Sequence, residues 1–198
     1  TTNGGGAWTD ITGTLPTGSN QITYIAVKDD DPATVWVTLG GYDGQRVYES
    51  TNSGNTWTNI STGLPNLPVM CIVQNKQNSS ETELYVGTDV GVYLKLGTNN
   101  WQSFSTNLPN VVIAELDIYY DATPANSKLR AGSFGRGLWE SDLYEAPTGP
   151  MTYVSCTTTQ NNTTDVSPGN TDQEIIGIEV VTSGSTSPFD VTSLTLNT

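Results

Sequence analysis

The stretch VYESTNSGNTWTNISTGLP at residues 47–65 contains two markers that recur along the chain, a tryptophan and a trailing Leu-Pro pair. The tryptophan is Trp57, with copies 49 residues earlier at Trp8 and 44 residues later at Trp101. The Leu-Pro pairs at 15–16, 64–65 and 108–109 step by the same two intervals. Because the two markers agree independently, they indicate an internal repeat, and this spacing is in the range of one four-stranded propeller blade.

Three strand-like segments separate successive tryptophan segments, and each is bounded by Gly, Asp, Asn or Pro. Their β-branched and aromatic composition predicts strands, and no segment shows a sustained 3.6-residue apolar period, so essentially no helix is expected. The tryptophan segments 7–12, 56–61 and 100–105 are expected to add a fourth, outer strand. The predicted inner strands of the three units are 22–27, 35–41 and 46–50; 69–73, 84–88 and 91–95; and 112–120, 129–133 and 137–141.

The third unit is followed by EAPTGP at 145–150, so no tryptophan segment comes after it, whereas the chain begins with an orphan one, AWTDIT. In a closed propeller, the opposite end of the ring lends such a missing strand, and three blades are too few to close. We therefore expect further blades upstream in a longer parent protein. The predicted fold is all-β, with about three four-stranded blades of a partial β-propeller at 1–144 and a linker at 145–150.

The composition excludes several classes of function. The chain has 198 residues, with 20 acidic and 7 basic side chains, a net charge of −13, no histidine and two cysteines. So few cations cannot displace the counterions of a nucleic acid, and the same balance disfavours anionic membranes. Without histidine there is no Ser-His-Asp or Cys-His catalysis and no histidine-ligated zinc. No apolar run is long enough to span a membrane, and Cys71 and Cys156 are not expected to pair.

The segment Ser50-Thr51-Asn52-Ser53-Gly54-Asn55-Thr56-Trp57 resembles the Asp-box, Ser/Thr-x-Asp-x-Gly-x-Thr-Trp, with Asn52 in the Asp position. The chain is thus similar to BNR-repeat β-propellers of the sialidase, sortilin and xyloglucanase superfamily. The physical roles of these residues are structural: an oxygen of Asn52 caps a tight turn, Gly54 takes a positive φ, and Trp57 covers a joint between sheets. The expected structural Asp-box residues are Ser50, Asn52, Gly54, Thr56 and Trp57, with degraded copies at Asn3 and Trp8 and at Trp101.

The ending AGSFGRGLWESDL resembles the last blade of sortilin-like propellers in secreted Bacteroidota proteins. Residues 151–198 differ in composition, with less charge and more Thr and Ser, and three β-patterned runs lie at 151–159, 174–182 and 191–197. The string from residue 167 onward resembles the Ig-like β-sandwich associated with BNR-repeat neuraminidases. This resemblance implies that Ile176, Ile178 and Val180 face a core. Three strands cannot complete such a sandwich, so an incomplete one is expected.

Glu115 and Asp117 are candidate catalytic residues. Strand alternation places them on one face of an inner strand, about 7 Å apart. The aligned positions of the other units are Tyr24 and Cys71 opposite Glu115. Two buried carboxylates need partners or water, so they either line the central channel or meet a cation such as Arg130.

A full sialidase site is not expected, because it needs three convergent arginines, and the chain has three in all, Arg46, Arg130 and Arg136. Packing salt bridges are the expected duty of these arginines.

The run Asp29-Asp30-Asp31-Pro32 is a candidate calcium site, because clustered oxygens in a loop suit a hard cation. The other units have polar turns at the same place, so a polar, solvated turn is sufficient to explain the run. No other cofactor is indicated.

We interpret the chain as a non-catalytic adhesion, display or scaffold segment of a secreted or cell-surface bacterial protein, with glycans or surface proteins as partners. The alternatives are a fragment of a sialidase-like or xyloglucanase-like glycoside hydrolase, and a sortilin-like peptide-binding propeller. The rest of the parent chain or neighbouring copies are expected to pair with the open strand edges.

Overall fold

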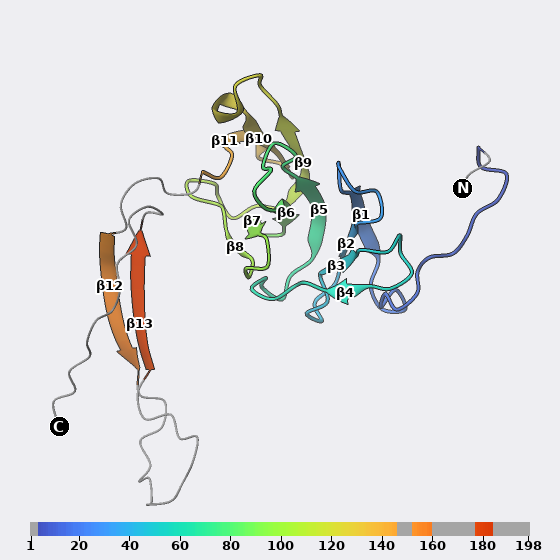
Figure 1. Cartoon of the computed structure of the whole chain (residues 1–198), viewed down its shortest axis with the longest axis horizontal. Coiled ribbons are helices and arrows are strands. Elements are labelled where there is room, and N and C mark those ends of the chain that lie inside the picture. The colour runs from blue at the N-terminus through green and yellow to red at the C-terminus, as the bar shows by residue number, and fades with distance from the viewer. Residues whose placement is uncertain (1–3, 146–151, 160–176, 184–198) are drawn as a thin grey trace, which may run out of the picture. The chain divides into compact units, whose positions relative to one another are not determined.

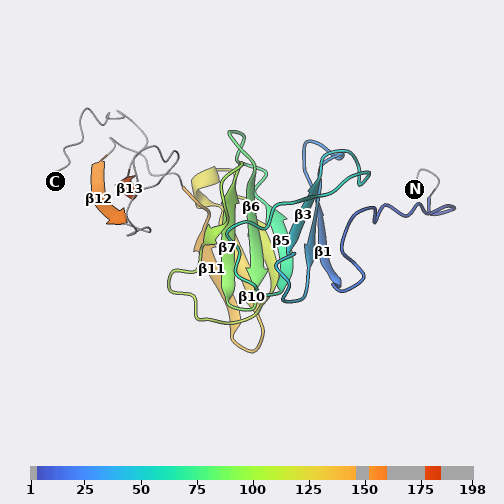
Figure 2. The ribbon, with the colours of Figure 1, turned by 90° about the horizontal axis from the view of Figure 1, so that it is seen from below.

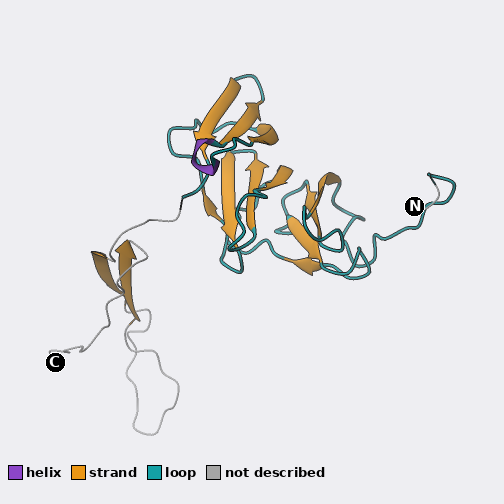
Figure 3. Cartoon of the chain, turned by 45° about the horizontal axis from the view of Figure 1, so that its top comes forward, coloured by secondary structure: helices purple, strands orange, loops and turns teal. Residues whose placement is uncertain are grey.

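The computed structural model describes residues 4–145, 152–159 and 177–183. Almost every regular element in these ranges is a β-strand, as predicted, and Figure 3 shows a single short helical turn among them. That turn is the 3-10 helix η1, Pro124–Asn126. No helix in these ranges has the length and apolar character that crossing a membrane requires.

The strands from Ile22 to Asp142 form three consecutive antiparallel sheets, which we call blades 1, 2 and 3 (Figure 1). In each blade the strands lie side by side in chain order. Blade 1 contains β1 (Ile22–Val27), β2 (Val35–Leu39), β3 (Val47–Ser50) and β4 (Thr58–Asn59). Blade 2 contains β5 (Val69–Gln74), β6 (Glu83–Thr88), β7 (Gly91–Leu96) and β8 (Gln102–Ser103). Blade 3 contains β9 (Ile113–Tyr119), β10 (Lys128–Ser133) and β11 (Gly137–Asp142).

Successive blades pack through their inner strands, β1 against β5 and β5 against β9. Figure 2 shows β5 on the side of blade 2 that faces blade 1. The core between blades 1 and 2 contains Trp36 of β2, Ile72 of β5 and Trp101, all almost fully buried. A second core lies on the other side of blade 1, where Leu15 packs with Val37, Leu39 and Tyr48. Consecutive antiparallel sheets that bury their faces against one another are the arrangement of a partial β-propeller.

The tryptophan segment at residues 7–12 was predicted as an outer strand, and this prediction is wrong. The equivalent segments form β4 and β8 because each pairs with the preceding third strand, Tyr48 with Asn59 and Tyr93 with Ser103. Residues 7–12 have no preceding third strand in the described chain, and they form no strand. An isolated segment has no ladder to hold it extended, so the strand needs its partner.

The chain divides by compactness into unit 1, Thr1–Leu143, and unit 2, Tyr144–Thr198. Unit 2 contains the antiparallel pair β12 (Thr152–Thr159) and β13 (Gly177–Ser183). Ile178 and Val180, which were predicted to face a core, are 38% and 41% exposed. Among the described residues of unit 2, no second sheet covers this two-stranded ribbon. Ile176, most of the predicted linker and the run at 191–197 lie outside the described residues.

The two cysteines should differ sharply in reactivity. Both are free thiols, Cys71 fully buried and Cys156 exposed. Burial raises the pKa of the Cys71 thiol to about 12, so the thiolate that attacks a disulfide reagent is scarce at neutral pH. We expect such a reagent to titrate one thiol in the native chain and two after unfolding. The Cys156→Ser variant should have no rapidly reacting thiol, and rapid reaction of that variant would contradict the burial of Cys71.

Candidate functional site

The inner strands of the three blades bring Tyr24, Cys71 and Glu115 to equivalent positions. Each residue lies on the first strand of its blade and pairs with an equivalent residue on the second strand. Tyr24 pairs with Thr38, Cys71 with Gly87 and Glu115 with Gly132. Because β1, β5 and β9 pack in succession, these side chains are close enough for their charges to interact. We call this group the inner-strand cluster.

Within this cluster, the pKa of Tyr24 responds to Glu115. Burial raises the pKa of the Tyr24 hydroxyl above its usual 10.0, and the nearby Glu115 carboxylate raises this pKa further. The Asp117 carboxylate contributes in the same direction and least. Tyr24 is therefore a protonated hydrogen-bond donor at neutral pH. A nucleophile needs the opposite, a lowered pKa or a base that takes its proton.

Glu115 and Asp117 are exposed, while the alternate residues Leu116 and Ile118 of β9 are buried. The contact with Arg130, one of the two alternatives that the sequence left open, is not formed in the described structure. Arg130 is the register partner of both Asp117 on β9 and Glu140 on β11. Its Nε donates to Glu140 Oε2 at 2.9 Å, and its guanidinium lies 4.9 Å from the centre of the Tyr119 ring. The two carboxylates thus avoid the cost of burial by facing solvent.

The charge of Glu115 can be tested through Tyr24. Changing Glu115→Gln removes the second-largest cause of the raised pKa, so the pKa of Tyr24 should fall towards 10.0, with the contribution of burial remaining. Tyrosinate absorbance followed against pH measures this shift, and the difference from a Tyr24→Phe variant assigns the transition to Tyr24. Asp117→Asn is the matched control and should shift the same transition less. Equal shifts from the two variants would contradict the interaction between Tyr24 and Glu115.

The raised pKa also predicts a loss of stability in alkali. A tyrosine whose folded pKa lies above its unfolded value stabilises the fold fully below the unfolded pKa, and this contribution disappears as the pH rises through the folded pKa. Tyr24, Tyr48 and Tyr120 all have pKa values that burial raises above 10.0. We expect the urea midpoint of unit 1 to fall above about pH 10. Tyr24→Phe should weaken that dependence.

The turn at Ser50–Trp57 satisfies its own polar groups. Asn52 Oδ1 accepts the Thr56 amide at 2.9 Å, and Ser50 Oγ accepts the Gly54 amide at 2.8 Å. Asn52 Nδ2 donates to Thr56 Oγ1 at 2.8 Å. Gly54 has a φ of +85°, and a Cβ there would meet Ile11 at 2.8 Å. Ser50, Asn52, Gly54 and Thr56 therefore each have a local structural use.

The tryptophans join neighbouring parts of unit 1. Trp57 Nε1 donates to the Ile11 carbonyl at 3.0 Å, and Trp101 Nε1 donates to the Ile60 carbonyl at 2.7 Å. Trp8, the earliest copy, is 85% exposed, and Asn3 lies outside the described residues. Within the described structure, Trp57 and Trp101 therefore each link neighbouring segments, and Trp8 does not.

The three aspartates of the candidate calcium site, residues 29–31, interact with different partners. Asp31 accepts the Ala33 amide and the Thr34 hydroxyl, and these hydrogen bonds lower its pKa. Asp30 pairs with Lys28 at 3.1 Å, and Asp29 lies 4.0 Å from Lys76. In the described ranges, no three His, Cys, Asp or Glu residues gather as a metal site. The run is a polar turn, the alternative weighed from the sequence.

Arg46 forms a packing salt bridge, as predicted. It precedes β3 and is fully buried, with its Nη1 3.0 Å from Asp43 Oδ1 and its Nη2 bonded to Asn66. Asn20 donates to the same Asp43 carboxylate at 2.6 Å, and these contacts lower the pKa of Asp43. Arg46 therefore locks the loop between β2 and β3, as expected of a packing salt bridge.

Comparison with known proteins identifies no family. No family model matches the chain, and no curated protein matches it. Among solved structures, the GH74 xyloglucanase from Xanthomonas campestris aligns with 73% of this chain at 13% sequence identity and a TM-score of 0.44. The chain spans 27% of the length of that protein. A similarity of this degree assigns no activity or site to this chain.

Proposed function

We propose that this chain is a non-catalytic extracellular segment of a larger secreted or cell-surface bacterial protein, with unit 1 as a rigid module for adhesion or display. The observation that carries the proposal is the state of the inner-strand cluster. Tyr24 is held protonated, and the cation nearest in register, Arg130, pairs with Glu140. The cluster can bind polar groups but lacks an activated nucleophile.

The arginines and the surface charge support the same function. Arg46 is buried in its loop and Arg130 of β10 is paired with Glu140 of β11, so neither is available to clamp an anionic sugar. The net charge of −13 keeps the chain soluble and repels anionic partners. Neutral glycans and surface proteins are the partners that this surface suits.

We further infer that the Ser50–Trp57 turn is an Asp-box of the BNR-repeat type, as found in sortilin-like propellers. The capping by Asn52, the positive φ of Gly54 and the contact of Trp57 with Ile11 support this assignment. In such a module the turn fixes the blade joints and leaves the inner strands to form the binding surface.

A glycoside hydrolase remains the second candidate, because Glu115 and Asp117 are exposed on one face of β9. Two carboxylates about 7 Å apart fall within the range of acid and base pairs in glycosidases. In such an enzyme, the Glu115 carboxylate would react next to the Tyr24 hydroxyl, and the Asp117 carboxylate would react from an exposed position.

Binding and hydrolysis assays on the whole chain separate these functions. We expect retention of neutral glycans on an array without release of reducing ends from xyloglucan or of sialic acid from sialosides. The Glu115→Gln, Asp117→Asn double variant should alter binding alone. Hydrolysis by the wild type that the double variant lacks would overturn the non-catalytic assignment. Retention of peptides and not glycans would favour the sortilin-like alternative.

A further inference from the structure

The two joints inside unit 1 use the same hydrogen bonds. In each, a tryptophan Nε1 donates to the carbonyl of the residue three positions after the preceding tryptophan, Trp57 to Ile11 and Trp101 to Ile60. By the same rule, Phe104 is the next acceptor after Trp101. No described residue donates to the Phe104 carbonyl.

The outer strands are also fastened by a hydroxyl four residues after each tryptophan. Ser61 Oγ accepts the Val47 amide and donates to the Val47 carbonyl. Ser105 Oγ makes the same pair of bonds with Val92. Thr12 is equivalent to Ser61 and Ser105, and Leu138, on the edge strand β11, is equivalent to Val47 and Val92. The chain therefore contains the hydroxyl and the backbone groups for a third pair of such hydrogen bonds, at opposite ends of unit 1.

The β1 part of the leading face of blade 1 is apolar and exposed, whereas the equivalent parts of blades 2 and 3 are buried. The β2 and β3 part of the same face is covered by Leu15. Ile25 is 59% exposed, whereas its equivalents Ile72 and Leu116 are 2% and 4% exposed. Ile22 and Val27 are also exposed. We use the term head face for Ile22, Ile25 and Val27 on this surface together with Trp8 of the preceding segment 7–12.

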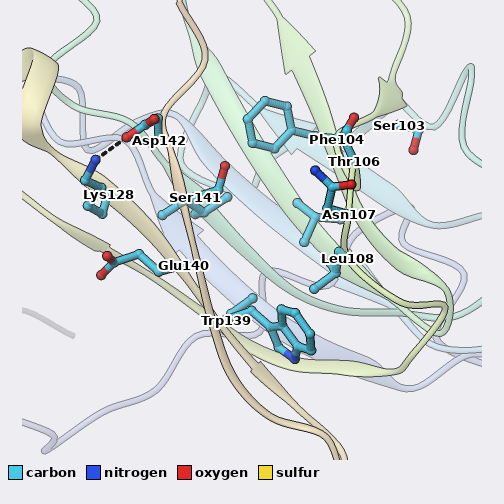
Figure 4. Close-up of a pocket in the computed structure, with 13 residues that line it drawn as sticks. Ser103, Phe104, Thr106, Asn107, Leu108, Lys128, Trp139, Glu140, Ser141 and Asp142 are labelled. Carbon is cyan, nitrogen blue, oxygen red and sulfur yellow. Dashed lines mark hydrogen bonds and ion pairs between the residues drawn. The ribbon is translucent and has the colours of Figure 1, made fainter.

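The trailing face of blade 3 shows the complementary exposure. Leu138 of β11 is 73% exposed, whereas its equivalents Val47 and Val92 are 0% and 2% exposed. A groove of about 670 Å³ lies between β11 and the segment after β8. Figure 4 shows Trp139 and Glu140 of β11 on one side of this groove and Asn107 and Leu108 on the other. Because Leu138 and Trp139 are consecutive in β11, Leu138 lies on the trailing face and Trp139 on the opposite side, in the groove. We use the term tail face for both sides of this open edge, Leu138 on one and Phe104, Leu108 and Trp139 on the other.

We propose that the tail face of one copy of this chain binds the head face of a second copy, with residues 7–12 added to β11 as the fourth strand of blade 3. The two internal joints argue for this occupant, because the head face presents the side chains that the preceding joints bury. The inference is independent of glycan or peptide binding at the inner strands.

The internal joints fix the register of the added strand. Tyr48 pairs with Asn59 and Glu49 with Thr58 in blade 1, so Trp139 pairs with Asp10 and Glu140 with Thr9 of the second copy. Trp8 Nε1 then donates to the Phe104 carbonyl. The Thr12 hydroxyl bridges the amide and carbonyl of Leu138.

This contact is heterologous, since the two copies contribute different faces. Each added copy leaves one tail face and one head face open, so association continues until a ring closes. Two copies supply six blades, which falls within the four to eight of closed propellers. A closed pair is the smallest assembly that leaves neither face exposed.

The test is the mass of the whole chain in solution, measured by sedimentation over a range of concentrations. We expect the mass to rise from 21.2 kDa for one chain towards that of two. Trp8→Ala and Leu138→Glu should each weaken association at least about tenfold, because each removes an apolar anchor from the joint. The control is Val154→Glu, which changes an exposed apolar residue of unit 2 and should leave association unchanged.

A chain that stays a monomer at every accessible concentration would overturn the proposal and leave both faces to other blades of a parent protein or to a different protein. Association that survives Leu138→Glu, or that Val154→Glu abolishes, would also overturn it. A synthetic peptide of residues 5–17 provides a second readout that does not depend on the stability of a variant. The peptide should bind wild-type chain and compete with self-association, and its Trp8→Ala form should bind at least about tenfold more weakly.

Discussion

Replacing Trp101 with alanine is expected to destabilise unit 1 by about 3–5 kcal/mol. The indole is 3% exposed and packs with Trp36 and Ile72 in the core between blades 1 and 2. Its Nε1 donates to the Ile60 carbonyl, which would lose that partner. Domains are stable by about 5–15 kcal/mol, so this loss removes a large share of the folding free energy.

Urea denaturation followed by circular dichroism measures the loss, and Trp8→Ala is the matched control. Trp8 occupies the same repeat position but is 85% exposed, so its removal should change the free energy of unfolding by less than about 0.5 kcal/mol in the monomer. Trp101→Phe keeps most of the buried ring and loses the hydrogen bond, so it should fall between the two. Equal decreases in the free energy of unfolding for Trp8→Ala and Trp101→Ala would contradict the packing of Trp101 between blades 1 and 2.

The repeat predicts the sheets well because strand pairing here is local. Every paired strand in unit 1 follows its partner after a short turn, so composition and turn residues between Ile22 and Asp142 suffice to place β1 to β11. The prediction fails at residues 7–12, where the same residue types lack a third strand to pair with. A strand is a property of the pair, and the sequence of one segment does not reveal whether its partner is present.

The candidate site was predictable in part. Alternation alone places Glu115 and Asp117 together on one face of β9, and the structure has both exposed there. Alternation does not choose among cross-strand neighbours, and Arg130, which borders Asp117 and Glu140 equally in register, pairs with Glu140. The interaction of Glu115 with Tyr24 joins the first and third blades, and only the packing of the inner strands brings it about.

The second large effect is expected at Gly87 of β6. A Cβ at this position would lie 2.7 Å from Cys71 Sγ and 2.9 Å from the Ile113 carbonyl oxygen. The backbone of β9 cannot retreat without opening the joint between blades 2 and 3. Gly87→Ala should therefore destabilise unit 1 by about 1–3 kcal/mol, the usual cost of overpacking a filled core.

The matched control is Gly132→Ala in β10, the equivalent position of blade 3. There the nearest atom to a new Cβ is Glu115 Cβ at 3.7 Å, an ordinary van der Waals contact. Alanine at a position with room restricts the unfolded chain and stabilises a protein by about 0.4–1 kcal/mol. The two substitutions should thus have opposite signs when urea unfolding is measured at concentrations where the chain is monomeric. The difference arises because β9 covers Gly87 and no described strand covers Gly132, so a destabilising Gly132→Ala would show that blade 3 is already covered in the monomer.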